Sequence, residues 1–253
     1  MNLIDTHCHL DVAEFDTDRD AVLARARANG VGDIVVPGIH QAGWQGLLDL
    51  CAREPGLHPA LGLHPVYLAH HRRSDIELLQ RVASQERPVA IGEIGLDYFV
   101  PDLDRKTQQD FFEAQLQVAC DLHLPVVLHV RKAHDQVLAS LQRIQLVGGI
   151  AHAFNGSLQQ AKSYIALGFM LGFGGMLTYD RSTKLRSLAR DLPLEAIVLE
   201  TDAPDLTVAQ HRGERNSPEY LPLCLDALAE VRGSDRSVVA KTTTSNARAV
   251  LKL

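Results

Sequence analysis

The sequence feature that most constrains the fold is a regular alternation of short apolar segments with longer amphipathic segments along the chain. The short segments predict strands at residues 3–5, 33–37, 60–64, 89–93, 126–130, 149–154, 169–173 and 196–201. The longer segments predict helices at residues 21–29, 44–53, 76–85, 106–122, 135–144, 158–167 and 184–191, followed by two more at 218–231 and 237–251. Expected strands such as 126–128 and 197–199 are apolar without interruption, which is typical of parallel strands covered on both faces. About eight such units predict an α/β fold, a TIM-type (β/α)8 barrel, regular or distorted, with extra C-terminal helices, in preference to an open doubly wound sheet.

The chain is expected to form a single barrel domain over residues 1–253. It has no Gly/Ser-rich linker or low-complexity tract, and barrels of about 250 residues are common as one domain. The longest irregular segment, residues 203–217, follows the last expected strand. Barrel enzymes have their active sites on the face formed by the segments after the strands, so we expect residues 203–217 to overhang such a site.

The composition excludes several classes of protein. With 46% hydrophobic and 22% charged residues, the chain is globular rather than disordered or fibrous. A formal net charge of −6 excludes a surface that is one basic cradle for nucleic acid, although a few arginines and bound cations can still attract phosphate locally. No apolar stretch approaches the roughly 20 residues of a membrane span. The four cysteines are far apart without a CxxC pair, which argues against a zinc ribbon or a disulfide framework and favours a reduced, cytoplasmic setting.

Two histidines, His7 and His9, follow the first expected strand. Side chains two residues apart on an extended segment point to the same side, so both can reach one metal ion. Histidines in this pattern can equally be exposed or satisfied within the core. Their position at the C-terminal end of an expected barrel strand is what favours metal binding.

Four other expected strands end at or near a residue that can bind a metal, namely Glu93, His129, His152 and Asp202. A carboxylate such as Glu93 in an apolar, glycine-flanked segment needs either a cation or an ion pair with arginine. Each histidine alone could be a core or rim residue, and the prediction rests on their recurrence at equivalent points. Glu200 could form a structural pair in the barrel floor, and Asp202 is preferred as a ligand because a proline ends the strand just beyond it.

These six nitrogen and oxygen donors exceed what one tetrahedral ion needs, whereas two divalent ions about 3.5–4 Å apart would use them. Histidines and carboxylates without thiolates suit Zn²⁺, Mn²⁺ or a similar ion better than an all-oxygen Ca²⁺ cage, and Mg²⁺ stays open. In this interpretation Glu93 bridges the ions, a hydroxide between them is the nucleophile, and Asp202 takes a proton from the bound water. Glu93 and Asp202 are therefore the expected catalytic residues.

Four residues are candidate substrate contacts: His64, Arg131, Arg215 and Asn216. His64 follows the third expected strand, Arg131 follows the fifth, and Arg215 and Asn216 lie in the long segment 203–217. Arginines bind anions well, whereas an exposed arginine is often only a solvated charge, and His64 could be a rim histidine. Asp97 could cap an element, hydrogen-bond a ligand histidine or lie in a loop.

Eight short motifs in this order resemble those of TatD-type metal-dependent hydrolases, within the amidohydrolase-like barrels. They are DTHCHLD (5–11), GLHP (62–65), IGEIGLDY (91–98), LHVRKAHD (128–135), HAFNGS (152–157), GFGG (172–175), LETDAP (199–204) and GERNSP (213–218). The resemblance implies a barrel with two divalent ions and phosphodiesterase activity on DNA, often removing nucleotides from the 3′ end. It also implies that His7, His9 and Asp202 match the ligands of one ion, His129 and His152 those of the other, and Glu93 the bridge.

Two positions depart from the family pattern. The usual serine after phenylalanine is replaced by Asn155, and the small or polar residue before the arginine is Val130. Contacts close to the substrate are therefore where this chain is expected to differ from its relatives.

Three functions are weighed. The first is a phosphodiesterase or deoxyribonuclease that acts on nucleic-acid ends through a water activated by two metals, with no obligate protein partner inferred. The second is an amidase, deacetylase or lactonase on a small metabolite, because a metal-bound hydroxide attacks carbon and phosphorus alike. The third is a non-catalytic metal-binding barrel, which the intact ligand set disfavours. An open mouth lined by Arg131 and Arg215 would favour nucleic-acid ends, and a closed apolar pocket would favour a metabolite.

Overall fold

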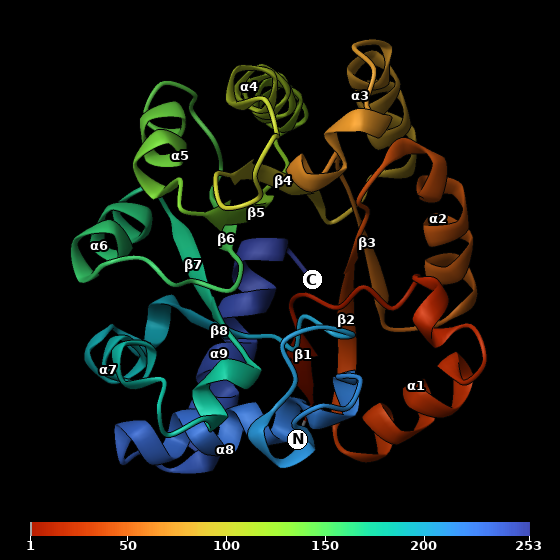
Figure 1. Cartoon of the computed structure of the whole chain (residues 1–253). Helices are drawn as coiled ribbons and strands as arrows, with labels where there is room; N and C mark the ends of the chain where they lie inside the picture. Colours follow the sequence, from red (N-terminus) through yellow and green to blue (C-terminus); the bar gives the residue numbers. More distant parts are fainter. Residues whose placement is uncertain (1) are drawn as a thin grey trace.

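A computed structural model describes residues 2–253 and contains a parallel sheet of eight strands that curves into a barrel (Figure 1). The strands pair in sequence order, each parallel to the next. They are β1 Leu3–Asp5, β2 Val31–Pro37, β3 Leu57–Leu61, β4 Ala90–Asp97, β5 Val126–Arg131, β6 Gly149–Ala151, β7 Phe169–Phe173 and β8 Ile197–Leu199. The predicted TIM-type barrel is confirmed.

The barrel closes between its first and last strands through the residues that follow them. Thr6 donates its backbone N–H to the carbonyl of Leu199 at 3.0 Å, and Asp202 donates to the carbonyl of His7 at 2.8 Å. A parallel bridge joins Cys8 to Ala203. The closing seam is therefore built partly from the backbone of two expected metal ligands, His7 and Asp202.

Helices surround the sheet, as Figure 1 shows. They are α1 Arg19–Ala28, α2 Trp44–Arg53, α3 Ser74–Glu86, α4 Arg105–Leu122, α5 His134–Leu141, α6 Leu158–Ala166, α7 Thr183–Asp191, α8 Leu221–Arg232 and α9 Arg236–Leu251. Short 3-10 turns lie in the connections, among them η3 Pro65–His70, η4 Gly175–Thr178 and η7 Pro218–Tyr220.

Local sequence fixes where several helices begin. Asp104 accepts from the N–H of Thr107 before α4, and Asp235 accepts from the N–H groups of Ser237 and Val238 before α9. Ser157 and Gln160 form a capping box at the start of α6. These side chains satisfy N–H groups that have no partner within the helix.

Two hydrophobic cores hold the barrel. The inner core takes one inward-facing residue from most strands, and Ala247 and Leu251 of α9 join it. Asn246 of the same helix donates to the carbonyls of Leu194 and Ile197, both at 2.8 Å. Helix α9 thus covers the end of the barrel where the strands begin, and the opposite end stays free for a site. The outer core lies between the sheet and the other helices and includes large side chains such as Phe112.

Some strand ends differ from the prediction. Strand β4 continues to Asp97, so Glu93 lies within the strand, where the pairing with β5 shifts register between Ile91 and Ile94. Strand β3 spans residues 57–61 rather than 60–64, and β8 spans residues 197–199 rather than 196–201, whereas β1 has the predicted bounds. A polar residue such as Glu93 does not end β4, because the strand keeps its pairing while the side chain points into the mouth of the barrel. Among the described residues, no helix combines the length and apolar character needed to cross a bilayer.

Candidate metal centre

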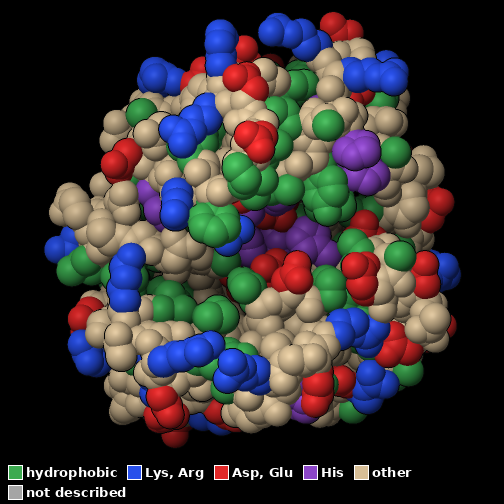
Figure 2. Space-filling view, viewed as in Figure 1, with side chains coloured by type: hydrophobic (Ala, Val, Ile, Leu, Met, Phe, Trp, Pro, Cys, Tyr) green, Lys and Arg blue, Asp and Glu red, His purple; other side chains and the backbone are tan. Residues whose placement is uncertain are grey.

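The six expected ligands meet at the open end of the barrel. Figure 2 shows histidines and carboxylates at the bottom of a central depression on this face. Glu93 comes from β4 and His129 from β5, and the remaining four follow strands directly: His7 and His9 after β1, His152 after β6 and Asp202 after β8. The depression has a volume of about 280 Å³.

One side of the centre gathers around the Oε2 atom of Glu93. His7 Nε2 lies 3.1 Å from this oxygen and His9 Nε2 lies 3.3 Å from it. The Oδ1 atom of Asp202 is 3.5 Å from His7 Nε2 and 3.8 Å from His9 Nε2. The two histidine nitrogens are themselves 3.2 Å apart. Four donor atoms thus surround one small space.

The other side gathers around Glu93 Oε1. His129 Nδ1 lies 3.0 Å from it, and His152 Nε2 lies 3.5 Å from it. His64 Nε2 is 3.3 Å from the same oxygen and 3.1 Å from His129 Nδ1. His64 was expected only as a substrate contact or a rim residue, and the structure places it, largely buried, among the potential ligands.

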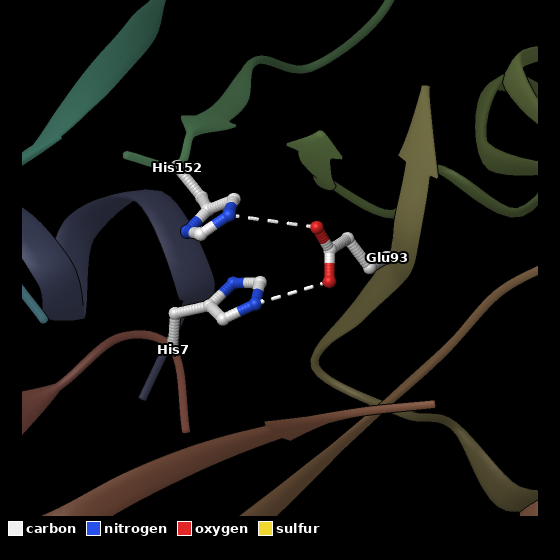
Figure 3. A group of neighbouring side chains, drawn as sticks. All are labelled: His7, Glu93 and His152. Carbon is white, nitrogen blue, oxygen red and sulfur yellow. Dashed lines mark hydrogen bonds and ion pairs between the residues drawn. The ribbon is translucent and has the colours of Figure 1, made fainter. Parts of the chain in front are cut away.

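The rings of His7 and His152 stack at a centroid distance of 3.7 Å, so they approach Glu93 together. Figure 3 shows them side by side, each aimed at a different oxygen of the carboxylate. Glu93 is buried, with 1% of its surface exposed. A carboxylate in this position, between two groups of donors, has the geometry of a bridging ligand.

The spacing of the donor atoms fits divalent ions. Ligand atoms bound to a tetrahedral ion at about 2.0–2.1 Å lie roughly 3.3 Å from one another. The nitrogen–oxygen separations around Glu93 run from 3.0 to 3.5 Å. Three groups of side chains could each hold an ion, namely His7, Glu93 and His152; His7, His9 and Asp202; and His64, Glu93 and His129. The residues present therefore fit metal ions.

Electrostatics within the cluster favour an ionised Glu93. Burial tends to raise its pKa, but the surrounding His64, His7 and His152 hold it well below the ordinary value. Burial lowers the pKa of His7 well below its usual range and that of His64 to about 4. An ionised carboxylate with neutral imidazoles is the state that binds a metal.

Other members of the cluster hold protons more tightly in the metal-free protein. Burial lowers the pKa of His152, but Asp202, Glu200 and Glu93 outweigh it and raise this pKa to about 10. The carboxylates Glu93 and Asp202 likewise outweigh burial at His9 and raise its pKa to about 9. For Asp202, burial dominates and raises the pKa to about 6.

Asp97 orients His129. Its Oδ2 atom lies 2.9 Å from His129 Nε2, and its Oδ1 atom accepts from the N–H groups of Phe99 and Val100. Burial alone would raise the pKa of Asp97, but these hydrogen bonds lower it to about 2. Of the alternatives left open by the sequence, Asp97 both caps the turn and holds a histidine, which leaves His129 Nδ1 facing Glu93.

Two further buried carboxylates support the centre. Glu200 Oε1 accepts from the N–H of Ala153 at 2.6 Å and lies 3.3 Å from His152 Nδ1, so Glu200 pairs beside the centre rather than in the barrel floor. Asp5 accepts from the N–H of His7 and from the N–H and hydroxyl of Thr201, which joins the segments after β1 and β8. No role was assigned to Asp5 from the sequence, although a carboxylate at the end of an apolar strand was a usable signal.

The expected substrate contacts divide into two groups. Arg131, the last residue of β5, is exposed, with its guanidinium 3.7 Å above the ring of Phe99. Arg215, in contrast, is bound to Asp18 through two nitrogens, at 2.9 and 2.7 Å, and lies over the ring of Phe15. Its guanidinium is already paired within the protein, so the expectation of a free anion contact is corrected.

Asn216 is also corrected as a substrate contact, because it is fully buried. Its amide donates to the carbonyls of Thr201 and Asp205 at 2.8 and 2.7 Å, and its oxygen accepts from the N–H of Ser217. Asn216 therefore fixes the loop after β8 from beneath. Its position in an irregular segment suggested exposure, whereas that segment folds back onto the barrel.

The sequence and the fold of this chain are similar to those of known proteins. The family model described as TatD related DNase matches residues 4–252. The metal-dependent hydrolase YjjV of Escherichia coli K12 is 40% identical over 247 residues, which cover 96% of this chain and 95% of that protein. The 3′-5′ ssDNA/RNA exonuclease TatD of Salmonella typhimurium is 35% identical over 261 residues, covering 99% of each. The crystal structure of the E. coli YjjV protein, a TatD homologue, superposes with a TM-score of 0.95 at 39% identity and covers 99% of this chain and 98% of that one.

Proposed function

This chain belongs to the family of TatD-related DNases, which are metal-dependent hydrolases, and we propose that it is a two-metal phosphodiesterase that shortens nucleic-acid strands from one end. The observation that carries the proposal is the position of Glu93 between two groups of donors. His7, His9 and Asp202 would hold one ion, and His129 and His152 the other, with His64 close to the second. The histidine content favours Zn²⁺ or Mn²⁺ over Mg²⁺.

When bound, two divalent ions supply an activated water and neutralise charge on the phosphate. Asp202 is placed to accept the proton of that water, because its Oδ1 atom faces the two histidines and its carboxylate borders the depression. A bound cation would keep Asp202 ionised and so able to accept this proton. Glu93, held ionised, keeps both donor groups in place.

Exposed residues next to the ends of β4 and β5 support a single-stranded nucleic acid as substrate. Phe99, with 48% of its surface exposed, lies under Arg131, and Lys132 Nζ is 4.8 Å from the same ring. An exposed aromatic ring flanked by cations can stack on a base while the cations attract the adjacent phosphate. The name of the S. typhimurium relative supports cleavage from the 3′ end of ssDNA or RNA. An exposed strand end also suits a net charge of −6, which offers no continuous basic surface for a duplex.

We further propose that residues 1–253 act as one barrel domain in the cytoplasm. Four free cysteines, Cys8, Cys51, Cys120 and Cys224, support a reducing compartment.

The test uses metal-loaded enzyme with end-labelled single strands, duplexes and a panel of amides and lactones. Asp202→Asn serves as the inactive variant, and Asp20→Asn, an exposed aspartate on α1, serves as the matched control. Shortening of single strands from one end that is lost in the first variant and kept in the second is the expected result. Activity restricted to amides or lactones would replace the proposal with the amidohydrolase alternative.

A further inference from the structure

Two glycines, Gly172 in β7 and Gly174 just after it, pack against the buried Glu200. They belong to the motif GFGG, residues 172–175, which runs from β7 into η4, and we refer to them as the glycine cradle. A Cβ atom added to Gly172 would lie 2.1 Å from Glu200 Oε2, and its three nearest neighbours would all be atoms of the Glu200 carboxylate. A Cβ atom added to Gly174 would lie 2.7 Å from the backbone oxygen of Glu200 and 3.4 Å from its Cγ atom. A side chain at Gly172 would therefore take the space that the Glu200 carboxylate occupies.

This arrangement does not favour the stability of the fold. A glycine inside a strand has no side chain to pack and loses more conformational freedom on folding than other residues do. Glu200, directly after β8, is 1% exposed, and its Oε2 atom has no hydrogen-bond partner among the described residues. A buried carboxylate oxygen without a donor is unfavourable. Stability alone therefore does not account for a glutamate at this position or for the glycines around it.

The other carboxylate oxygen of Glu200 faces His152. Oε1 accepts from the N–H of Ala153 at 2.6 Å and lies 3.3 Å from His152 Nδ1, which pairs with no other carboxylate in the described part of the chain. The opposite ring nitrogen, Nε2, lies 3.5 Å from Glu93 Oε1. Figure 3 shows Nε2 directed at Glu93 and the other nitrogen of the ring directed away from it. Glu200 is therefore on the side of the His152 ring away from the bridging carboxylate.

The same relation holds at His129, the other histidine expected to bind this ion. Asp97 Oδ2 lies 2.9 Å from His129 Nε2, and His129 Nδ1 lies 3.0 Å from Glu93 Oε1. A carboxylate behind a ligand histidine fixes the orientation of the ring and the nitrogen that carries the proton, which leaves the other nitrogen free for a metal. His129 and His152 thus each have one buried carboxylate, Asp97 and Glu200, on the nitrogen that points away from the ion.

We propose that Glu200 is a positioning residue that holds His152 with Nε2 toward the ion, and that the glycine cradle makes the room its carboxylate needs. The inference rests on the two-metal centre of the proposed function and adds to it a role for the motif GFGG. Glu200 is buried and acts through His152 rather than on the substrate. Because a side chain at Gly172 would displace the Glu200 carboxylate, a change at either residue should disturb the same contact.

The first experiment measures the Zn²⁺ affinity of each site by titration against a competing chelator. Glu200→Ala should weaken binding of the ion beside His152 by about 10- to 100-fold, the usual loss when a carboxylate behind a ligand histidine is removed. Glu200→Gln keeps an acceptor at the position of Oε1 and should lose less affinity. Gly172→Ala should reproduce the loss, whereas Gly46→Ala, at an exposed position of α2 where an added Cβ meets nothing within 4 Å, should keep the wild-type affinity. Unchanged affinity in Glu200→Ala, or equal losses in Glu200→Ala and Glu200→Gln, would overturn the assignment.

A double variant separates displacement of Glu200 from damage to β7. In Glu200→Ala the carboxylate is gone, so Gly172→Ala has nothing left to displace and the double variant should bind Zn²⁺ as Glu200→Ala does. Two substitutions that remove one shared contact are non-additive in this way. Additive losses would show that Gly172→Ala acts by disturbing the strand, and would overturn the role of the glycine cradle.

A spectroscopic readout reports on the His152 ring itself. NMR of the protein with ¹⁵N-labelled histidine at saturating Zn²⁺ should show a slowly exchanging proton on Nδ1 of His152 in the wild type. Glu200→Ala should lose this signal to exchange with water, while the Nε2 proton of His129, held by Asp97, should remain. A slowly exchanging Nδ1 proton on His152 in Glu200→Ala would overturn the positioning role.

The two proposals fail in different ways. A wild-type protein that binds fewer than two Zn²⁺ ions would overturn the two-metal centre, and this inference with it. Two bound ions with the same affinities in wild type and Glu200→Ala would overturn only the role of Glu200. If Glu200→Ala does not fold, as judged by circular dichroism, Gly172→Ala takes its place, and unchanged affinity in that variant would overturn the inference.

Discussion

Replacing Asp97 with asparagine should weaken metal binding on one side of the centre more than on the other. Asp97 makes three hydrogen bonds through its carboxylate, two from backbone N–H groups and one with His129 Nε2 at 2.9 Å. Asparagine can still accept both backbone bonds through its oxygen, but its amide nitrogen cannot accept from His129. The substitution therefore removes one interaction and keeps the turn.

The size of the effect follows from the pKa of Asp97. Its fall from 3.8 to about 2 corresponds to roughly 2–3 kcal/mol in favour of the ionised, hydrogen-bonded carboxylate. Part of this free energy belongs to the backbone bonds, which the variant keeps. Loss of a carboxylate that orients a ligand histidine commonly costs about 10- to 100-fold in metal affinity, and we expect a loss in this range for the ion beside His129.

The assay is a Zn²⁺ titration against a competing chelator, which gives the affinity of each site. Asp104→Asn is the matched control, because Asp104 caps α4 and asparagine caps a helix equally well. Unchanged affinity at both sites in Asp97→Asn would refute the orienting role of Asp97. An equal loss at both sites would show instead that the substitution disturbs the whole centre.

Four further outcomes are expected. Asp202→Asn should lower kcat by about 10²- to 10⁴-fold in a phosphodiesterase assay while metal content, measured by mass spectrometry, stays largely intact; a near-normal rate would leave it a structural role. Glu93→Ala should lose both ions together in the same metal analysis, and two filled sites would show that it does not bridge. Asn216→Ala should lower the free energy of unfolding in urea by about 2–4 kcal/mol, because it removes the donor to the buried carbonyl of Thr201 and to the carbonyl of Asp205. A change below about 0.5 kcal/mol would contradict this. In the folded, metal-free protein the pKa values of His9 and His152 are raised to about 9 and 10. Protonation of these histidines therefore stabilises the fold fully below about pH 6.5, and this stability is lost as pH rises through 9 and 10. The Tm of chelator-treated protein should fall from about pH 7 to 10, and a flat profile would contradict this.

The proximity of the six candidate ligands could be predicted from the sequence because each side chain follows or lies in a short parallel strand. In a barrel the C-terminal ends of the strands lie on one face, so residues that recur after successive strands in the sequence lie close together in space. The same reasoning placed Glu93 at the end of a strand, whereas Glu93 lies within β4. Side chains inside a strand can also reach the barrel mouth. This reasoning did not predict that His64 Nε2 lies 3.1 Å from His129 Nδ1, because a local sequence pattern does not show the path of the chain after β3.

The substrate contacts were harder to predict because they depend on how loops fold. Arg215 and Asn216 lie in one irregular segment, yet one is paired with Asp18 and the other is buried beneath the loop. Whether a loop side chain is free depends on partners far away in sequence, such as Asp18, which lies 197 positions before Arg215. A cavity of about 430 Å³ is likewise formed by the loops after β6, β7 and β8 with the start of α7, and no single stretch of sequence indicates it.

Closure of the barrel at the seam between β1 and β8 has a consequence for when the protein becomes competent to bind metal. The N–H of Asp202 bonds to the carbonyl of His7, so ligands from the two ends of the chain meet only when the last strand is in place. A chain emerging from the ribosome presents His7 and His9 early but cannot complete their site until residue 202 has been made and has crossed to β1. Binding of an ion by His7, His9 and Asp202 would therefore come late in biogenesis, and a bound ion would link the residues after the first strand to those after the last.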